Sequence, residues 1–122
     1  MKIYKSAEDY LESILMLKEK KDRVISLDVA NQFGYSKASV SRAMKNLRLD
    51  GYIEVDASGA ITLTKKGMDI ATKIYDRHKT LTKYFESIGV DPKTAEDDAC
   101  KIEHDISDET FNAIKNNLKN KW

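Results

Sequence analysis

The chain has 122 residues, of which 41% are hydrophobic and 34% are charged. This length and balance are typical of one globular domain, or of two small modules that share a core. No apolar run approaches the ~20 residues of a membrane span, and neither a signal peptide nor a membrane partner is expected. The single cysteine excludes an internal disulfide, so we expect a cytoplasmic protein.

The total charge of +1 hides an uneven distribution along the chain. Residues 18–67 hold ten Lys or Arg against six Asp or Glu, a balance of +4. Residues 84–122 hold five against nine, a balance of −4. The basic part suits a polyanionic partner and the acidic part does not, although random variation of the surface would also explain the difference.

The first half of the chain predicts three helices. Residues 7–20 have helical spacing after a capping pattern of Ser6 and Asp9. Gly34 allows a sharp helix exit, and Ser36 can cap the helix that follows. Two helices around such a turn are typical of a helix-turn-helix motif. Their predicted inner residues are Leu27, Ala30, Phe33, Val40, Ala43, Met44 and Leu47.

A short β-hairpin is predicted directly after this motif. Ile53 and Val55, then Ile61 and Leu63, alternate with polar residues around the turn sequence DASGA. A hairpin in this position is the wing of a winged helix. Residues 1–70 are therefore predicted to form a winged helix-turn-helix domain that binds DNA.

Residues 71–122 are expected to form an α-helical domain, so the whole chain is mainly α. Asp91 and Pro92 open one of its helices, and Ser107 caps the last. The predicted apolar positions are Met68, Ala71, Ile74, Leu81, Phe85 and Ile88, then Ala95, Ala99, Ile102 and Ile106, then Phe111, Ile114 and Leu118. The apolar stripe of the short last helix predicts a symmetric homodimer.

The second helix of the motif has polar and basic residues where it would enter a DNA major groove. Hydroxyls, cations and helix N-terminal amides are common donors to phosphate oxygens. A winged helix used for protein contacts is the alternative, which the basic balance disfavours. The predicted DNA-binding residues are Ser36, Lys37, Ser39, Ser41, Arg42 and Lys45, with Lys65 and Lys66 after the wing.

Potential metal ligands lie in three separate segments. The only cysteine, Cys100, lies close to Glu103 and His104, and on a helix these three positions would share one face. Each candidate has a simpler explanation, such as a surface charge, a hydrogen-bonded core histidine or a small buried thiol. The whole set of candidates also includes Asp9, Glu12 and His78. Chance is a weaker explanation for all of them together than for any one of them.

The sequence resembles the iron- and manganese-dependent repressors. The resemblance rests on "EDYLE", a winged helix, a long helix with "RH" and then "CKIEHDIS", and it covers nearly the whole chain. It implies a homodimer that binds operator DNA when loaded with Fe(II) or Mn(II), two ions per chain, in the short form without an SH3-like domain. It also implies that residues 71–122 carry the dimer interface. The implied ligands are Asp9, Glu12, His78, Cys100, Glu103 and His104.

The resemblance is mixed at two ligand positions. Asp9 is typical of the manganese branch, whereas Cys100 is typical of the iron branch, which implies that the site accepts both metals. Two alternatives stay open. One is a winged-helix transcription factor regulated by a non-metal ligand. The other is a metalloenzyme with Glu103 as general base, which is disfavoured because no nucleophile–base pair is visible, so we expect no enzyme.

Overall fold

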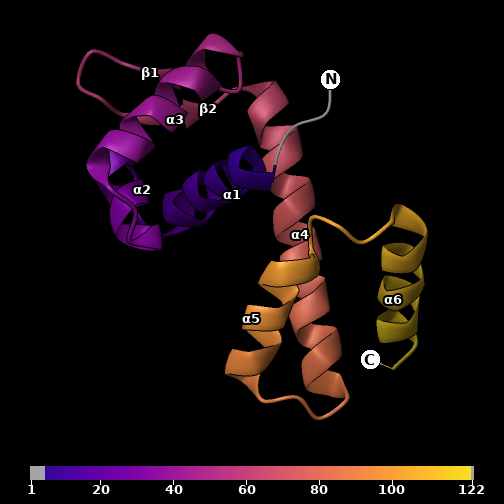
Figure 1. The fold of residues 1–122 in the computed structure, drawn as a ribbon. Helices are drawn as coiled ribbons and strands as arrows, with labels where there is room; N and C mark the ends of the chain where they lie inside the picture. The colour runs from indigo at the N-terminus through magenta and orange to yellow at the C-terminus, as the bar shows by residue number, and fades with distance from the viewer. Residues whose placement is uncertain (1–4, 122) are drawn as a thin grey trace. The chain divides into compact units, whose positions relative to one another are not determined.

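The computed structural model describes residues 5–121, as six helices and one two-stranded sheet (Figure 1). The chain divides into two compact units, one ending at Thr72 and one beginning at Lys73. No helix among the described residues is both long and apolar enough to cross a membrane. The elements are α1 (Lys5–Lys20), α2 (Ser26–Phe33), α3 (Lys37–Leu49), β1 (Ile53–Val55), β2 (Ile61–Leu63), α4 (Lys65–Ser87), α5 (Pro92–Ile102) and α6 (Asp108–Lys121).

The helix-turn-helix motif of the first unit follows from two local signals. Gly34 adopts φ 71° after α2, and its N–H donates to the Ala30 carbonyl at 2.8 Å. Ser36 then caps α3, because its hydroxyl oxygen accepts from the Ser39 N–H at 3.1 Å. Both features were predicted, and so was the hairpin. By contrast, α1 already begins at Lys5, so Ser6 lies inside the helix and the predicted capping pattern is wrong.

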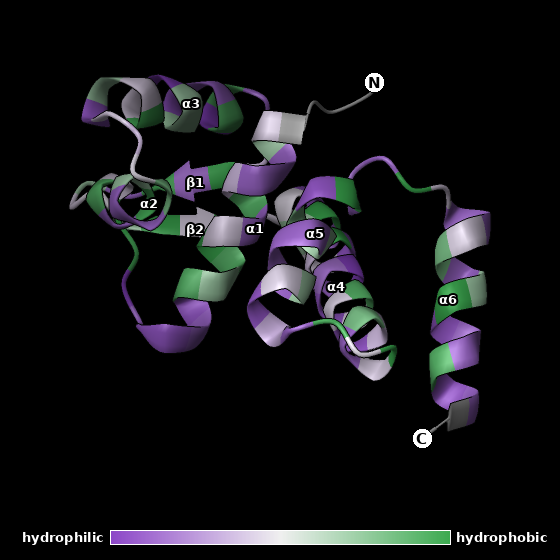
Figure 2. Ribbon diagram, turned by 60° about the horizontal axis from the view of Figure 1, so that its bottom comes forward, coloured by the Kyte–Doolittle hydropathy of each residue, from purple (hydrophilic) through white to green (hydrophobic). Residues whose placement is uncertain are grey.

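The first unit has a continuous apolar core. α1 packs against α2 and β2, and α3 packs against α2 and β1. Hydrophobic and hydrophilic residues alternate along α3, as its half-buried position requires (Figure 2). The core consists of Leu11, Ile14, Val24, Val29, Ala30, Val40, Met44, Leu47, Tyr52, Ile53, Ile61 and Ala71.

Two predicted core residues of this unit are exposed instead. Leu27 is 42% exposed and Met68 is 41% exposed. The buried residues of α2 are Val29 and Ala30, and at about 100° per residue Leu27 lies about 160° around the helix from Val29. Helical spacing alone did not determine which side of these helices faces the core.

The wing is held by its own polar contacts. The carboxylate of Asp56 accepts from the N–H of Ser58 at 2.8 Å, its hydroxyl at 2.7 Å and the N–H of Ala60 at 3.0 Å. These hydrogen bonds hold the pKa of Asp56 below its usual value, and the bond from the Ser58 hydroxyl has the largest influence. Arg23 donates to the Ser58 carbonyl, and the Ile61 N–H donates to the Val24 carbonyl at 2.8 Å. The loop before α2 thus fixes the hairpin.

The first turn of α4 lies close to the main chain that precedes β1. Thr64 donates from its hydroxyl to the Gly51 carbonyl at 2.7 Å and receives the Gly67 N–H at 3.2 Å. A Cβ atom at Gly67 would lie 2.0 Å from the Tyr52 carbonyl oxygen. Glycine is therefore required here for close packing, and not for an unusual backbone angle.

The second unit comprises the rest of α4 with α5 and α6. Asp91 caps α5 and Ser107 caps α6, as predicted, each through a side-chain oxygen that accepts a main-chain N–H at 3.1 Å. Its buried apolar residues are Ile74, Leu81, Ala95, Ala99, Phe111 and Leu118. The predicted inner residues Ile88 and Ile102 are 56% and 37% exposed, because the small alanines form the packed face of α5 and Ile88 lies beyond the end of α4.

Candidate metal centre and nucleic-acid interface

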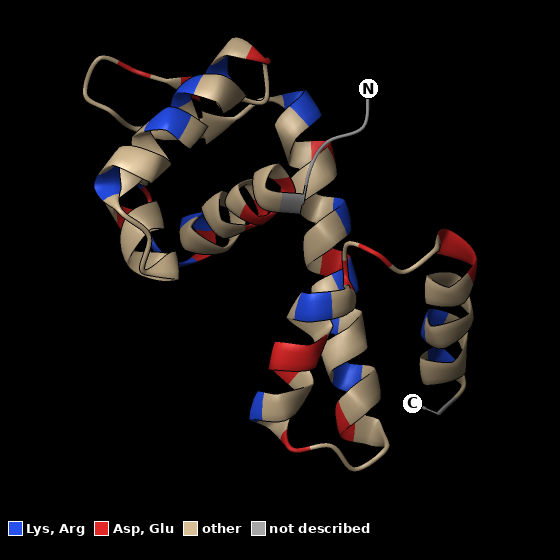
Figure 3. Ribbon diagram, in the orientation of Figure 1, with Lys and Arg blue, Asp and Glu red and all other residues tan. Residues whose placement is uncertain are grey.

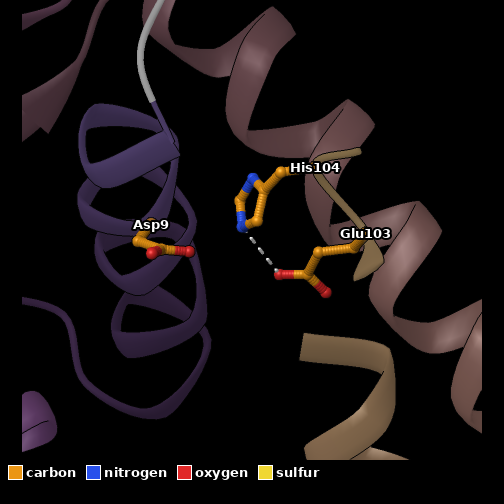
Figure 4. Close-up of side chains that lie close together, drawn as sticks. All are labelled: Asp9, Glu103 and His104. Carbon is orange, nitrogen blue, oxygen red and sulfur yellow. Dashed lines mark ion pairs between the residues drawn. The ribbon is translucent and has the colours of Figure 1, made fainter. Parts of the chain in front are cut away.

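Glu103 is the centre of a polar cluster in the second unit. It follows the last residue of α5, and its side chain is fully buried. One carboxylate oxygen, Oε2, lies 2.8 Å from Nδ1 of His78 on α4. The other, Oε1, lies 3.4 Å from Nε2 of His104 (Figure 4). The two carboxylate oxygens thus face two different imidazoles.

The chemistry of this cluster fits a divalent transition metal. Burying a carboxylate is unfavourable unless it is paired or coordinates a metal. Imidazole nitrogens and carboxylate oxygens are the ligand types that Mn, Fe and Zn accept. A carboxylate with one oxygen towards each of two imidazoles can also bridge two ions. The donor set therefore fits the metals that the sequence implies.

The first unit has two carboxylates on one helix. Asp9 and Glu12 are three residues apart on α1, so they lie on neighbouring turns of one face. Glu12 is only 6% exposed, and Asp9 is half-buried. Because α1 begins before Ser6, the capping role that competed for Asp9 is removed. A glutamate buried beside the apolar Leu11 and Ile14 is a ligand candidate.

Cys100 is placed differently from the other candidates. It is exposed, and it lies within α5, whereas α5 ends at Ile102, before Glu103 and His104. The predicted common helix face is therefore only partly formed, because the two strongest ligands lie in the turn after the helix. Ligation by Cys100 remains a prediction.

An aromatic cluster joins α1 to the turn of the helix-turn-helix motif. The Tyr10 ring lies edge-on to Phe33, at 5.8 Å, and to Tyr35, at 6.0 Å between centroids. Phe33 and Tyr35 stack on each other at 5.1 Å. Burial, followed by the charges of Tyr35 and Asp9, raises the pKa of Tyr10. The residue next to Asp9 thus contacts the segment that leads into α3.

The exposed side of α3 is a candidate nucleic-acid interface. Lysines and arginines are spread along this helix (Figure 3). Lys37, Ser41, Arg42 and Lys45 are exposed, as groove contacts would require. A hollow of about 300 Å³ beside them is lined by Ser26, Ser41, Met44, Lys45, Arg48 and Val55. Arg48 was missed, although its spacing of seven from Ser41 places it on the same helix face.

Other predicted DNA-binding residues have contacts within the chain. The Ser36 hydroxyl donates to the Ser39 hydroxyl at 2.9 Å, so both residues serve the cap of α3. Lys66 donates to the Asp50 carbonyl at 3.1 Å, and its ammonium lies 4.2 Å from the centre of the Tyr52 ring. Lys65 is exposed beside Asp69, at 3.7 Å. Phosphate contacts by these residues remain predictions.

Two family models together cover almost the whole chain. Residues 2–61 match the N-terminal DNA binding domain of the iron dependent repressors, and residues 64–121 match their metal binding and dimerisation domain. The chain belongs to the iron dependent repressor family. This family consists of DNA-binding transcriptional regulators, and the match confirms the resemblance found in the sequence.

Individual relatives agree with this family. An uncharacterised HTH-type transcriptional regulator of Methanocaldococcus jannaschii is 39% identical over 112 residues, which cover 90% of each chain. The HTH-type transcriptional regulator MntR of Bacillus subtilis is 33% identical, covering 84% of this chain and 72% of that protein. A manganese-dependent transcriptional repressor in complex with manganese has a TM-score of 0.85 at 29% identity, covering 93% of this chain. This chain spans 52% of that repressor's length.

The family assignment decides between the functional alternatives. Its second domain is described as metal binding, which favours metal-dependent regulation over a winged-helix factor that responds to a non-metal ligand. The mainly helical fold with one hairpin wing is the fold of this family. The sequence-based predictions of fold class and family are confirmed.

Proposed function

We propose that the protein is a homodimeric repressor that binds operator DNA when it is loaded with Fe(II) or Mn(II), and that it controls metal homeostasis. The observation that carries the proposal is the buried Glu103 carboxylate between His78 and His104, in a chain whose other unit is a winged helix. The family assignment supports both the DNA-binding and the metal-binding roles.

The proposed ligands come from both units, and Glu103 would hold both ions. A bound divalent ion would supply one positively charged centre that gathers carboxylates and imidazoles from separate helices. α1 provides the two carboxylates, while α4 and the end of α5 provide the imidazoles and the bridge. The full proposed set is Asp9, Glu12, His78, Cys100, Glu103 and His104.

The first unit has contacts through which a change in the position of α1 on metal binding would reach the DNA-binding helix α3. α1 packs on α2 and β2, and Tyr10 contacts both Phe33 and Tyr35. α1 therefore cannot shift without disturbing the turn that Ser36 closes. Metal promotes DNA binding in this scheme only through its higher affinity for the DNA-competent arrangement.

The DNA side of the proposal uses the exposed face of α3 in the major groove. A dimer would present two such helices to half-sites about 34–36 Å apart, or a multiple of that spacing. Lys37, Arg42, Lys45 and Arg48 would add charge contacts, so affinity should fall steeply as salt rises.

The deciding experiment is a DNA-binding titration with and without metal. Duplexes selected in vitro with Mn(II)-loaded protein are titrated at fixed ionic strength, with and without a chelator. Metal should strengthen binding by about 5- to 150-fold, the usual range of an allosteric coupling. Glu103→Gln should remove this gain, whereas Glu109→Gln, a change at an exposed carboxylate, should keep it. Equal affinity with chelator and with metal would refute the proposal.

The preferred metal depends on Cys100. Thiolate favours Fe(II) over Mn(II), which binds most weakly in the divalent series. We therefore propose that the site accepts both ions and binds Fe(II) more tightly. Cys100→Ser should weaken Fe(II)-activated DNA binding more than Mn(II)-activated binding under anaerobic conditions. Unchanged curves for both metals would mean that Cys100 is not a ligand.

A further inference from the structure

Arg77 is a buried cation in the second unit, only 5% exposed. Its Nη1 atom donates to the Glu103 carbonyl at 3.1 Å and to the Ile106 carbonyl at 2.6 Å. Its Nη2 atom donates to the Asp108 carboxylate, which forms an ion pair with it. One guanidinium therefore holds three groups within residues 103–108, which comprise the turn between α5 and α6 and the first residue of α6.

The contacts of Arg77 satisfy main-chain groups that the local fold leaves open. The last carbonyls of a helix have no partner inside the helix, and Glu103 follows directly after α5. Buried carbonyls without partners are unfavourable. From a different helix, α4, Arg77 supplies donors to the Glu103 carbonyl and to the Ile106 carbonyl in the turn beyond it, at sequence distances of 26 and 29 residues.

Arg77 and its neighbour His78 hold the two ends of Glu103. His78 contacts the Glu103 carboxylate at 2.8 Å, while Arg77 contacts its main-chain carbonyl. Consecutive residues of α4 thus fix both the side chain and the backbone of the same glutamate. This arrangement limits how far the carboxylate can move when its surroundings change.

We infer that Arg77 is a positioning residue for the metal centre. It fixes the 103–107 turn so that Glu103 and His104 present their donor atoms, and through Asp108 it ties that turn to the start of α6. The inference rests on the proposed function for its metal-binding consequence only. Its structural part concerns the turn itself and can be tested without metal.

Lysine cannot replace arginine in this position. The planar guanidinium presents several donors in a fixed fork and stays charged at all relevant pH values. A lysine ammonium is a single point on a flexible stem, so it could not hold two carbonyls and a carboxylate in the same geometry. Arg77→Lys therefore keeps the charge while removing the fork.

A second ion pair between the same helices provides the matched control. Lys115 of α6 donates to Asp76 of α4 at 3.0 Å. Lys115 and Arg77 both approach the Phe111 ring, at 5.8 and 5.3 Å from its centre. The contacts found for Lys115 are with Asp76 and Phe111, outside the 103–107 turn, so Lys115→Met changes the α4–α6 contact without touching the turn.

The first measurement is amide hydrogen exchange of the metal-free full chain. The N–H groups of Asp105, Ile106, Thr110 and Phe111 are hydrogen-bonded and report on the turn and the first turn of α6. Arg77→Lys should speed their exchange by about tenfold or more through local opening. Lys115→Met should leave the turn amides unchanged. Equal exchange in wild type and Arg77→Lys would overturn the inference.

The second measurement is Mn(II) binding, followed by the loss of the free-ion EPR signal. Mutation of residues that orient metal ligands typically weakens metal affinity by about 10- to 100-fold. Arg77→Lys should therefore weaken Mn(II) binding by about tenfold, and Lys115→Met should not. Loss of affinity in both variants to the same extent would overturn the positioning role, since any weakening of α6 would then suffice.

A milder variant keeps the test decisive if Arg77→Lys does not fold. Asp108→Asn removes the ion pairs with Arg77 and Lys73 and leaves both carbonyl contacts of Arg77. This variant should speed amide exchange at Thr110 and Phe111, while the amides of Asp105 and Ile106 should stay as protected as in wild type. If Glu103→Gln and wild type bind Mn(II) equally, the proposed metal site is wrong, and the exchange data still decide whether Arg77 fixes the turn.

Discussion

The two units of this chain differ in what they bury. The first unit has a continuous apolar core that runs from Leu11 to Ala71, with Glu12 and Ser13 as its only buried polar side chains among the described residues. The second buries Arg77 and Glu103 beside a smaller set of apolar residues, two of which are the alanines Ala95 and Ala99. The first unit is therefore held mainly by the hydrophobic effect, which is not directional. The second depends on directional contacts that only one geometry satisfies.

The comparison predicts the largest loss of stability when an apolar core side chain is removed. Ile14 is fully buried in the first unit, and Ile14→Ala should destabilise it by about 2–5 kcal/mol. Leu49 is 69% exposed, so Leu49→Ala should change stability by less than about 0.5 kcal/mol. Urea denaturation followed by circular dichroism measures both. Similar midpoints for the two variants would contradict the assignment of the core.

The next largest loss of stability is predicted for a substitution that adds an atom to a closely packed position. Alanine is about 1 kcal/mol better than glycine inside a helix, but a Cβ at Gly67 would lie 2.0 Å from a main-chain oxygen of Tyr52. Overpacking typically destabilises by about 1–3 kcal/mol, so Gly67→Ala should be net destabilising. Asp69→Ala, at an exposed position of the same turn, serves as the control in thermal denaturation. A stabilised Gly67→Ala would show that α4 can move away from Tyr52.

A smaller loss of stability is predicted for removing the contacts between cations and an aromatic ring in the second unit. Phe111 is 6% exposed, and its ring lies near the cations of Arg77 and Lys115. Phe111→Leu keeps an apolar side chain but removes the ring face, whose contact with a cation is worth about 0.5–1 kcal/mol at exposed sites and about 2 kcal/mol when desolvated. The variant should unfold at a lower urea concentration than wild type. Identical stability of the leucine variant would mean that only burial matters here.

The smallest predicted effect depends on pH. The hydrogen bond from Lys21, and then that from the Ile25 N–H, hold the pKa of Asp28 below its usual value. Because the folded pKa is the lower one, this contribution is complete above the unfolded pKa near ~3.9 and is lost as pH falls through the folded value. The stability difference between wild type and Asp28→Asn should therefore shrink on acidification. A stability difference that stays constant on acidification would contradict this prediction.

Local features of the fold were predictable because they depend on neighbouring residues. Gly34, Ser36 and Asp91 act within a few positions of themselves, and the structure has them in the predicted roles. Helix orientation was less predictable, as Leu27 and Met68 show, because spacing defines a face but not the direction in which it points.

The polar contacts of the second unit could not be derived from spacing. The partners of Arg77 are main-chain carbonyls 26 and 29 residues away, which have no sequence signature. His78 and Glu103 were paired through resemblance to a family, and their 2.8 Å contact is a product of tertiary packing. The end of α5 at Ile102, which separates Cys100 from the ligand turn, was also invisible in the pattern.

The fixed wing has a consequence for the entropy of association. Asp56 and Arg23 order the hairpin tip when the chain folds. Ordering a flexible backbone costs about 1–2 kcal/mol per residue, and a loose wing would lose this freedom at the moment it met a partner. A wing ordered beforehand moves that loss from association to folding. A wing ordered in this way would meet a partner without a further loss of backbone freedom, and the exposed Glu54 and Asp56 would already be in place.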